Sequence, residues 1–187
     1  MTAIVWIRRS LREHDNTALV EASKNHEKVV PVYIVDDQYF SETELGYPRV
    51  RFWHDSLTEF RQTMLKDGKQ VIIRRGKPLE ELEKLVEEID ADKLYFNRDY
   101  TPYARERDEK ARELDIEVET FKDAVMFEKK EILTNSGDPY SVYSYYRNKW
   151  FDREKPRPRS VEEYEVPEME SAEIPSVEEL GYEKPEE

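Results

Sequence analysis

The chain opens on the apolar stretch Ala3-Ile4-Val5-Trp6-Ile7, and a second apolar stretch follows at Val29-Val30-Pro31-Val32-Tyr33-Ile34-Val35. Both runs are almost continuously apolar, which is typical of strands that are covered on both faces in a parallel sheet. A third run of this kind spans Val71–Arg74, and weaker runs span Lys93–Phe96 and Glu117–Phe121. The sequence therefore predicts five strands.

Helical patterns lie between these strands. In Pro48–Lys66 the apolar residues recur at steps of three and four, which places them on one face of a helix, and Leu79–Ile89 repeats the pattern. Pro102 stands where a helix over Tyr103–Leu114 would begin. Because strand and helix alternate, the expected fold class is α/β. We expect a doubly wound, Rossmann-like, five-stranded parallel sheet of order 3-2-1-4-5 with helices on both faces.

The alternation ends near Lys122, and the chain divides into three expected regions. Residues 1–133 form the α/β domain. Residues 134–153 contain a turn and then a dense run of aromatic residues, which predicts a helix that packs on this domain or at an interface. Residues 154–187 are acidic and contain several prolines, which is the composition of an irregular linker with little core of its own.

The composition argues against several classes of function. The 43 acidic and 30 basic residues give a net charge of −13, which repels a phosphate backbone and disfavours a stand-alone DNA-binding domain. Cysteine is absent and the three histidines are not spaced as metal ligands, so we expect no disulfide and no metal site. No apolar run approaches the ~20 residues of a membrane span, so we expect a cytoplasmic protein without membrane contact.

Two segments follow the carboxyl ends of predicted strands, and these are the candidate site. Residues 8–16 follow the first strand with arginines in place of a glycine-rich phosphate loop, which disfavours ordinary dinucleotide binding. Residues 97–107 follow the fourth strand. In a doubly wound sheet ligands bind at this edge, so both segments are expected to face one site. Alternatively, the arginines only form ion pairs with Asp15 and with the loops opposite.

Three motifs resemble those of DNA photolyases and cryptochromes. The first is Val5-Trp6-Ile7-Arg8-Arg9-Ser10-Leu11-Arg12-Glu13-His14-Asp15-Asn16, which is similar to the family pattern W-x-R-R-D-L-R-x-x-D-N. It departs at Ser10, where the family usually has aspartate, and this departure predicts that a local ion pair is missing. The other two motifs run from Asn97 to Asp108 and from Asn135 to Tyr143, with Trp150 after the latter. Val177–Tyr182 is also similar to the family's linker.

The resemblance covers nearly the whole chain and implies the amino-terminal domain of this family. In the family this domain holds a light-harvesting antenna and passes excitation to FAD in a helical domain, whose reduced flavin repairs cyclobutane pyrimidine dimers. The full-length parent would be a deoxyribodipyrimidine photo-lyase, whereas this chain is expected to lack the FAD domain and to hold no catalytic residue. The implied partner is that helical domain, in cis or in trans, and damaged DNA is reached only through it.

The antenna differs among members of the family, which use a folate, a deazaflavin or a flavin. Folate-type members carry Asn-Glu where this chain has Tyr103-Ala104. Members that use 8-hydroxy-5-deazaflavin, the chromophore of coenzyme F420, share the pattern Asn-x-Asp-x-x-Pro-Tyr-x-Arg-x-Arg-Asp, which this chain keeps from Asn97. The resemblance therefore implies a deazaflavin, whose contacts fall on four residues: Ile34, Arg49, Asp99 and Arg107. For the two arginines, plain surface ion pairs are the alternative.

Two other functions fit the same sequence. A cryptochrome-type photoreceptor would use the same α/β domain, because the features that separate it from a photolyase lie in the helical domain. A stand-alone nucleotide-binding or electron-transfer protein with a Rossmann-like sheet would bind an adenine nucleotide instead. The absorbance of a co-purified chromophore would distinguish the antenna domain from this last class.

Overall fold

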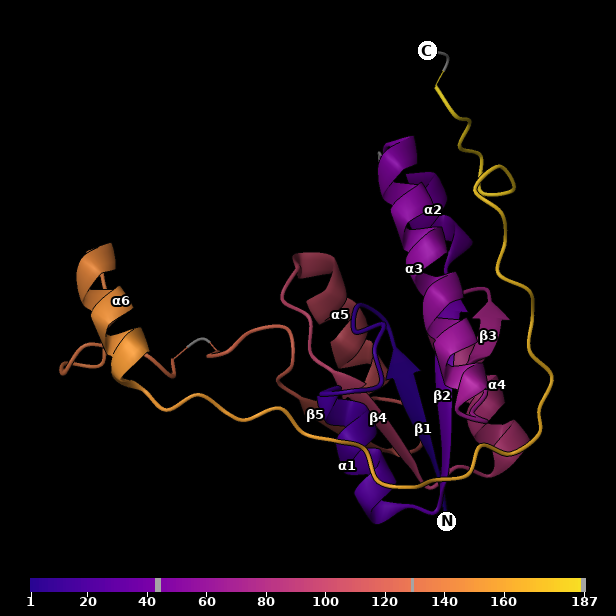
Figure 1. Ribbon diagram of the computed structural model, residues 1–187, viewed down its shortest axis with the longest axis horizontal. Helices are drawn as coiled ribbons and strands as arrows, with labels where there is room; N and C mark the ends of the chain where they lie inside the picture. Colours follow the sequence, from indigo (N-terminus) through magenta and orange to yellow (C-terminus); the bar gives the residue numbers. More distant parts are fainter. Residues whose placement is uncertain (43–44, 129, 186–187) are drawn as a thin grey trace.

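The computed structural model describes residues 1–42, 45–128 and 130–185. Its centre is a five-stranded parallel sheet in the order β3-β2-β1-β4-β5, as Figure 1 shows. The strands are β1 (Thr2–Ile7), β2 (Lys28–Val35), β3 (Ile72–Arg75), β4 (Lys93–Asn97) and β5 (Glu117–Phe121). The predicted fold class, strand number and strand order are confirmed.

Six helices accompany the sheet: α1 (Thr17–Asn25), α2 (Asp37–Glu42), α3 (Tyr47–Lys66), α4 (Pro78–Ile89), α5 (Pro102–Ala111) and α6 (Tyr143–Asp152). Proline stands in the first turn of α3, α4 and α5, where the missing N–H costs no intrahelical hydrogen bond. The short helix α2 was not predicted. It begins because Asp36 Oδ1 accepts hydrogen bonds from the backbone N–H groups of Gln38 and Tyr39, at 3.1 and 3.3 Å.

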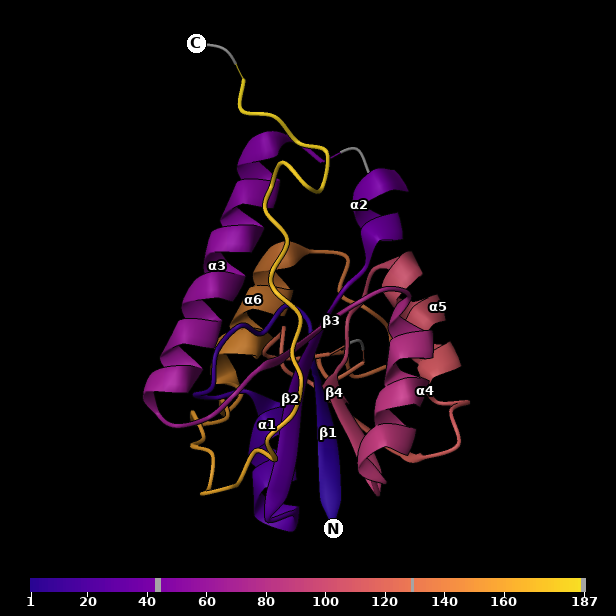
Figure 2. The ribbon, with the colours of Figure 1, turned by 90° about the vertical axis from the view of Figure 1, so that its right-hand side faces the viewer.

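The core has two layers, one on each face of the sheet. Successive β1 residues point to opposite faces, so Val5 packs in the layer of α1 and α3, whereas Ile4 packs in the layer of α4 and α5. Figure 2 shows α3 on one side of the sheet and α4 and α5 on the other. The carboxyl ends of the strands therefore lie between α5 on one face of the sheet and α2 and α3 on the other face.

The expected linker packs on the α/β domain over much of its length. Residues 159–182, here called the C-terminal strap, pass the amino ends of the strands and then follow β3 upward (Figure 1). The backbone N–H of Glu165 donates to Glu27 O at 2.8 Å, and that of Ala172 donates to Ile73 O at 2.9 Å. Tyr164 and Val177 are buried in the layer of α1 and α3. The strap has little core of its own because it shares that of the sheet.

Helix α6 stands apart from the sheet layers in Figure 1, and none of its residues is buried. Trp150 packs edge-to-face on Phe127, with ring centroids 5.9 Å apart. Tyr143, Tyr145 and Phe151 are exposed at 73, 64 and 66% of their surface. The described part of α6 therefore presents aromatic side chains to solvent.

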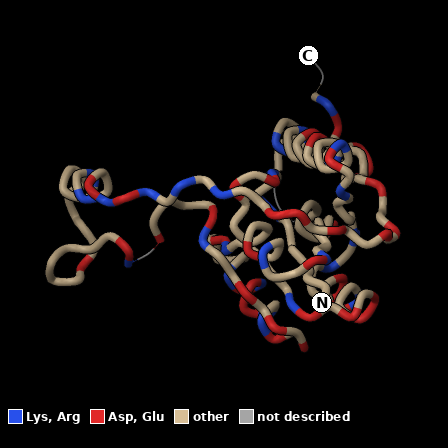
Figure 3. The backbone as a smooth tube through the Cα atoms, turned by 60° about the horizontal axis from the view of Figure 1, so that its bottom comes forward, with Lys and Arg blue, Asp and Glu red and all other residues tan. Residues whose placement is uncertain are grey.

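Two further features are the distribution of charged residues and the length of the helices. Figure 3 shows Asp and Glu mixed with Lys and Arg over the α/β domain, whereas residues 160–183 contain several glutamates and no lysine or arginine. Among the described residues, no helix has the length and apolar character needed to span a bilayer.

Candidate functional site

The two segments after β1 and β4 meet at the edge where the strand order reverses. The guanidinium of Arg8 donates through Nη2 to the backbone carbonyl of Asn97. Asn97 Nδ2 donates to Asn16 Oδ1 at 2.8 Å, and Asn97 Oδ1 accepts from the backbone N–H of Ala18 at 2.9 Å. Residues 8–16 and 97–107 therefore form one contiguous structure, as expected from the topology.

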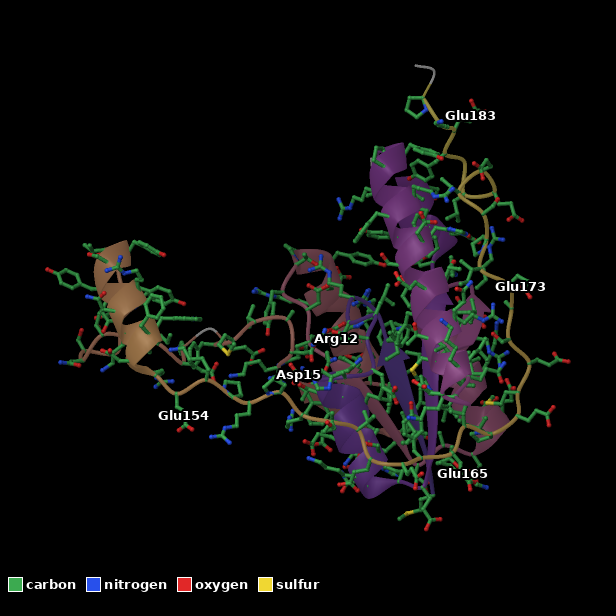
Figure 4. The ribbon with its side chains drawn as sticks, in the orientation of Figure 1. Arg12, Asp15, Glu154, Glu165, Glu173 and Glu183 are labelled. Atoms are coloured by element: carbon green, nitrogen blue, oxygen red, sulfur yellow. The ribbon has the colours of Figure 1, made fainter. Side chains whose placement is uncertain are left out.

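Much of the first motif has a structural role at the start of α1. Asn16 is fully buried, donates to the carbonyls of Ser10 and Arg12 at 3.2 Å, and accepts from the backbone N–H of Leu19. It is the N-cap of α1. Figure 4 labels Arg12 and Asp15 beside this helix, where Arg12 Nη2 donates to the Asp15 carbonyl at 2.8 Å. These polar residues hold the loop rather than offer groups to a ligand.

Asp123, which lies just after β5, completes this loop. Its side chain is only 1% exposed and accepts from Arg12 Nη2 at 3.0 Å, from the backbone N–H of Thr17 at 3.0 Å and from the hydroxyl of Ser10. Ser10 thus donates to the same carboxylate with which Arg12 forms an ion pair. No local pattern pointed to this partner, because Asp123 lies 111 residues from Arg12.

A second buried group, here called the arginine cluster, consists of Arg8, Arg107 and Asp108. Arg8 Nη1 and Arg107 Nη2 both contact Asp108 Oδ1, the latter at 3.1 Å. Arg8 lies 4.8 Å from the ring centroids of Trp6 and Phe96, and Arg107 lies 4.8 Å from that of Trp6. Two guanidinium groups thus share one carboxylate within an aromatic surround.

The electrostatics of the cluster follow from this crowding. Burial lowers the pKa of Arg8 to about 10, and repulsion by Arg107 adds to the fall, while Asp108 opposes it. Arg8 therefore stays protonated at neutral pH. The three residues carry two positive charges and one negative charge. Their net positive charge favours an oxygen acceptor that approaches Arg107 from the side exposed to solvent.

Helix α2 reaches α5 beside the cluster. Tyr103 O–H donates to Asp36 Oδ2 at 3.0 Å, and its ring centroid lies 6.0 Å from that of Tyr39. Burial, and then the Asp36 carboxylate, raises the pKa of Tyr103 to about 12. The Tyr103 ring also lies 5.6 Å from the Arg107 guanidinium, so rings and a cation form a continuous row from α2 to the buried Trp6 of β1.

The four predicted site residues differ in how closely they approach one another. Arg107 belongs to the arginine cluster, and Asp99 pairs with Arg9 at 3.1 Å and acts electrostatically on Arg8. Ile34 is buried in the layer that contains Trp6. Arg49 is exposed at the start of α3, and among the described residues its side chain has no ion-pair partner. Asp99 and Arg107 both act electrostatically on Arg8, but among the described residues no hydrogen bond or ion pair joins them, and Arg49 has no such contact with either.

Sequence reasoning missed Asp108, Asp36 and Asp123 as members of these networks. Asp108 ends the second motif, so the motif carried a signal for it. Asp36 carried none, since it directly follows a strand in a chain rich in acidic residues. The described residues contain no group of three or more His, Cys, Asp or Glu side chains arranged to hold a metal ion.

The chemistry of this edge fits a planar chromophore. Such a ligand needs rings to stack on, a few oriented donors and an open approach. Tyr103 is 50% exposed and the Arg107 side chain 18%, so both reach the surface. A separate hollow lined by Arg9, Asn97 and Asp99 measures only 20 Å³, which is room for about one water. The more open part of this edge is therefore the side of Arg107 and Tyr103.

Comparison with known proteins gives consistent results. The DNA photolyase family model matches residues 3–167. A deoxyribodipyrimidine photo-lyase of Halobacterium salinarum is 35% identical over 201 residues, which cover 98% of this chain and 41% of the relative. Cryptochrome-1 of Aedes aegypti is 28% identical, over 93% of this chain and 34% of the relative.

Among solved structures, an archaeal photolyase from Sulfolobus tokodaii with two FAD molecules superposes with a TM-score of 0.75 at 28% identity. The match covers 89% of this chain and 39% of the other. This chain thus spans about two fifths of the length of these photolyases. Since the family model matches most of the chain, and the fold and all three motifs agree with it, this chain belongs to the DNA photolyase family as its amino-terminal α/β domain.

Proposed function

We propose that this chain binds a light-harvesting antenna chromophore for a photolyase that repairs cyclobutane pyrimidine dimers. The observation that supports this most is the row from Tyr39 through Tyr103 and Arg107 to the buried Trp6, which combines rings and a cation at the carboxyl edge of the sheet. Ligands bind at this edge in doubly wound folds. When bound, the chromophore would absorb light and pass the excitation to FAD in the helical domain.

The proposed antenna is 8-hydroxy-5-deazaflavin. Arg107 would donate to a carbonyl or phenolate oxygen, Asp99 would accept from a ring N–H, Tyr103 would stack on the ring system, and Ile34 and Arg49 would complete the site. Tyr103-Ala104 in place of Asn-Glu argues against a folate. A flavin is the second candidate, because the similar Sulfolobus tokodaii photolyase holds two FAD molecules, which imply a novel light-harvesting cofactor in that protein.

Titration of the purified chain with 8-hydroxy-5-deazaflavin tests this proposal. We expect a saturable shift of the visible absorption band, with folate and FMN as comparison ligands. Replacing Arg107 or Asp99 with alanine should weaken binding about tenfold or more, because a charge-assisted hydrogen bond is lost. Arg105→Ala is the matched control, since Arg105 is an exposed arginine of the same helix. No saturable shift with any of these ligands would contradict the proposal.

The proposed partner is the helical FAD domain, and the exposed rings of α6 are the surface offered to it. Without that cover, the chain is expected to self-associate at high concentration. Gel filtration should show larger species, and replacing Tyr143, Tyr145 and Phe151 with serine should restore a monomer. Phe52→Ser is the control, because Phe52 is a similarly exposed ring on α3. A wild-type chain that stays monomeric at high concentration would contradict this expectation.

A cryptochrome-type photoreceptor is the second candidate function. It is supported by the match to the mosquito cryptochrome over most of this chain. Both candidates require the same antenna surface here, and they differ in whether the complete protein repairs dimers in light. Repair of a dimer-containing oligonucleotide by the complete protein would therefore decide between them.

A further inference from the structure

Asp108 is buried at the centre of the arginine cluster, and its contacts are unequal. The residue is 4% exposed on α5, and its Oδ1 atom receives both Arg8 and Arg107. Its Oδ2 atom is buried without a hydrogen-bond partner among the described residues. A buried carboxylate is costly unless it is paired, and here two arginines compensate the charge of Asp108.

Arg8 contacts Asp108 from the side of the sheet and limits the orientation of its carboxylate. The Arg8 guanidinium packs against the rings of Trp6 and Phe96 and donates to the Asn97 carbonyl as well as to Asp108. A guanidinium with partners in several directions has one orientation. Arg8 therefore holds the Asp108 carboxylate at a set position beneath α5.

Arg107 is then oriented by Asp108. Its Nε and Nη2 atoms both donate to Asp108 Oδ1, at 3.4 and 3.1 Å. Its guanidinium lies between the rings of Trp6 and Tyr103, at 4.8 and 5.6 Å from their centroids. Among the described residues, no hydrogen-bond acceptor is found for Arg107 Nη1. The Nη1 edge of Arg107 is therefore available to donate to a ligand.

We infer that Asp108 is a positioning residue for the antenna, which it serves by holding Arg107 with its Nη1 edge directed to a ligand oxygen, while Arg8 holds Asp108. This inference rests on the proposed function. It separates Arg107, which touches the chromophore, from Asp108 and Arg8, which act only through Arg107. The ligand group recognised here is a carbonyl or phenolate oxygen on a planar ring system.

A double-mutant cycle on chromophore affinity tests the inference. Asp108→Asn keeps the shape of the side chain but removes its charge, and it should weaken binding of 8-hydroxy-5-deazaflavin about tenfold in the wild-type background. In the Arg107→Ala background the same substitution should change the affinity less than about twofold, because the group that Asp108 positions is gone. Arg8→Lys should show the same dependence on Arg107, with a smaller effect.

Glu128→Gln is the matched control, because Glu128 also receives two N–H groups of one arginine, Arg98, and lies outside the arginine cluster. It should leave the affinity within about twofold of wild type in both backgrounds. Circular dichroism confirms that each variant is folded, and if Asp108→Asn does not fold, the Arg8→Lys cycle carries the test. If the wild-type chain binds FMN and not the deazaflavin, the same cycle is measured with FMN.

The outcomes are distinct. Effects of Asp108→Asn that persist in the Arg107→Ala background would overturn the inference and leave the proposed function standing. Equal affinity of the Asp108→Asn variant and the wild type would do the same. Failure of the wild-type chain to bind any of the chromophores would overturn the proposed function, and the inference with it.

Discussion

Replacing Asp123 with alanine is expected to lower the free energy of unfolding by about 3 kcal/mol. The substitution leaves the first backbone N–H of α1, on Thr17, without an acceptor, and it also removes the partner of the largely buried Ser10 hydroxyl. Arg12 loses its only carboxylate partner among the described residues. Urea unfolding followed by tryptophan fluorescence measures the loss.

Two further variants separate the contributions of Asp123. Arg12→Ala should cost less than about 1 kcal/mol, because the Arg12 side chain is 43% exposed and its ion pair is screened by solvent. Asp123→Asn keeps one acceptor oxygen and should fall between the two. A loss below about 1 kcal/mol for Asp123→Ala would show that water replaces the carboxylate at the start of α1.

Removing residues 160–187 is expected to destabilise the domain by roughly 5 kcal/mol, enough to prevent stable folding in many small domains. Tyr164 and Val177 are lost from the core, together with the partly buried Val161, Ile174 and Leu180. The backbone N–H of Ile73 also loses the Ser171 hydroxyl, and the Ile73 carbonyl loses the N–H of Ala172. Equilibrium unfolding gives the size of the effect.

The same truncation should make the chain aggregate, because β3 is the last strand of the sheet and its outer edge becomes free. Light scattering at increasing concentration tests this. Removing only residues 183–187 is the control, since it retains Tyr182, whose hydroxyl donates to Phe40 O at 2.5 Å. A truncated chain that remains soluble and as stable as the control would show that the strap neither stabilises the domain nor protects the edge of β3.

The fold was predictable because the residues within each strand carry the apolar pattern that identifies it. Residues 3–7 and 29–35 are apolar on both faces, and they occupy the centre of the sheet, where both faces are covered. The strap was not predictable as a packed element, because its buried residues Tyr164 and Val177 follow no helical or strand period. They are buried by contact with the sheet layer, and a tertiary contact of this kind leaves no periodic signal in the strap itself.

The candidate site was predictable in outline and not in detail. Topology placed residues 8–16 and 97–107 at one edge, and Arg8 does contact Asn97 there. The pairing of Arg12 with Asp123 was not foreseen, because many carboxylates were available in so acidic a chain.

The course of the strap has a consequence for engineering the domain. In many small domains the two termini lie close together, so a short linker joins them and new termini can be opened elsewhere. Here the strap carries the chain from the amino ends of the strands past their carboxyl ends, and Figure 1 shows the N label below the sheet and the yellow part of the strap beside the far end of α3. A circularly permuted version would need a linker as long as the sheet is tall, laid alongside the strap.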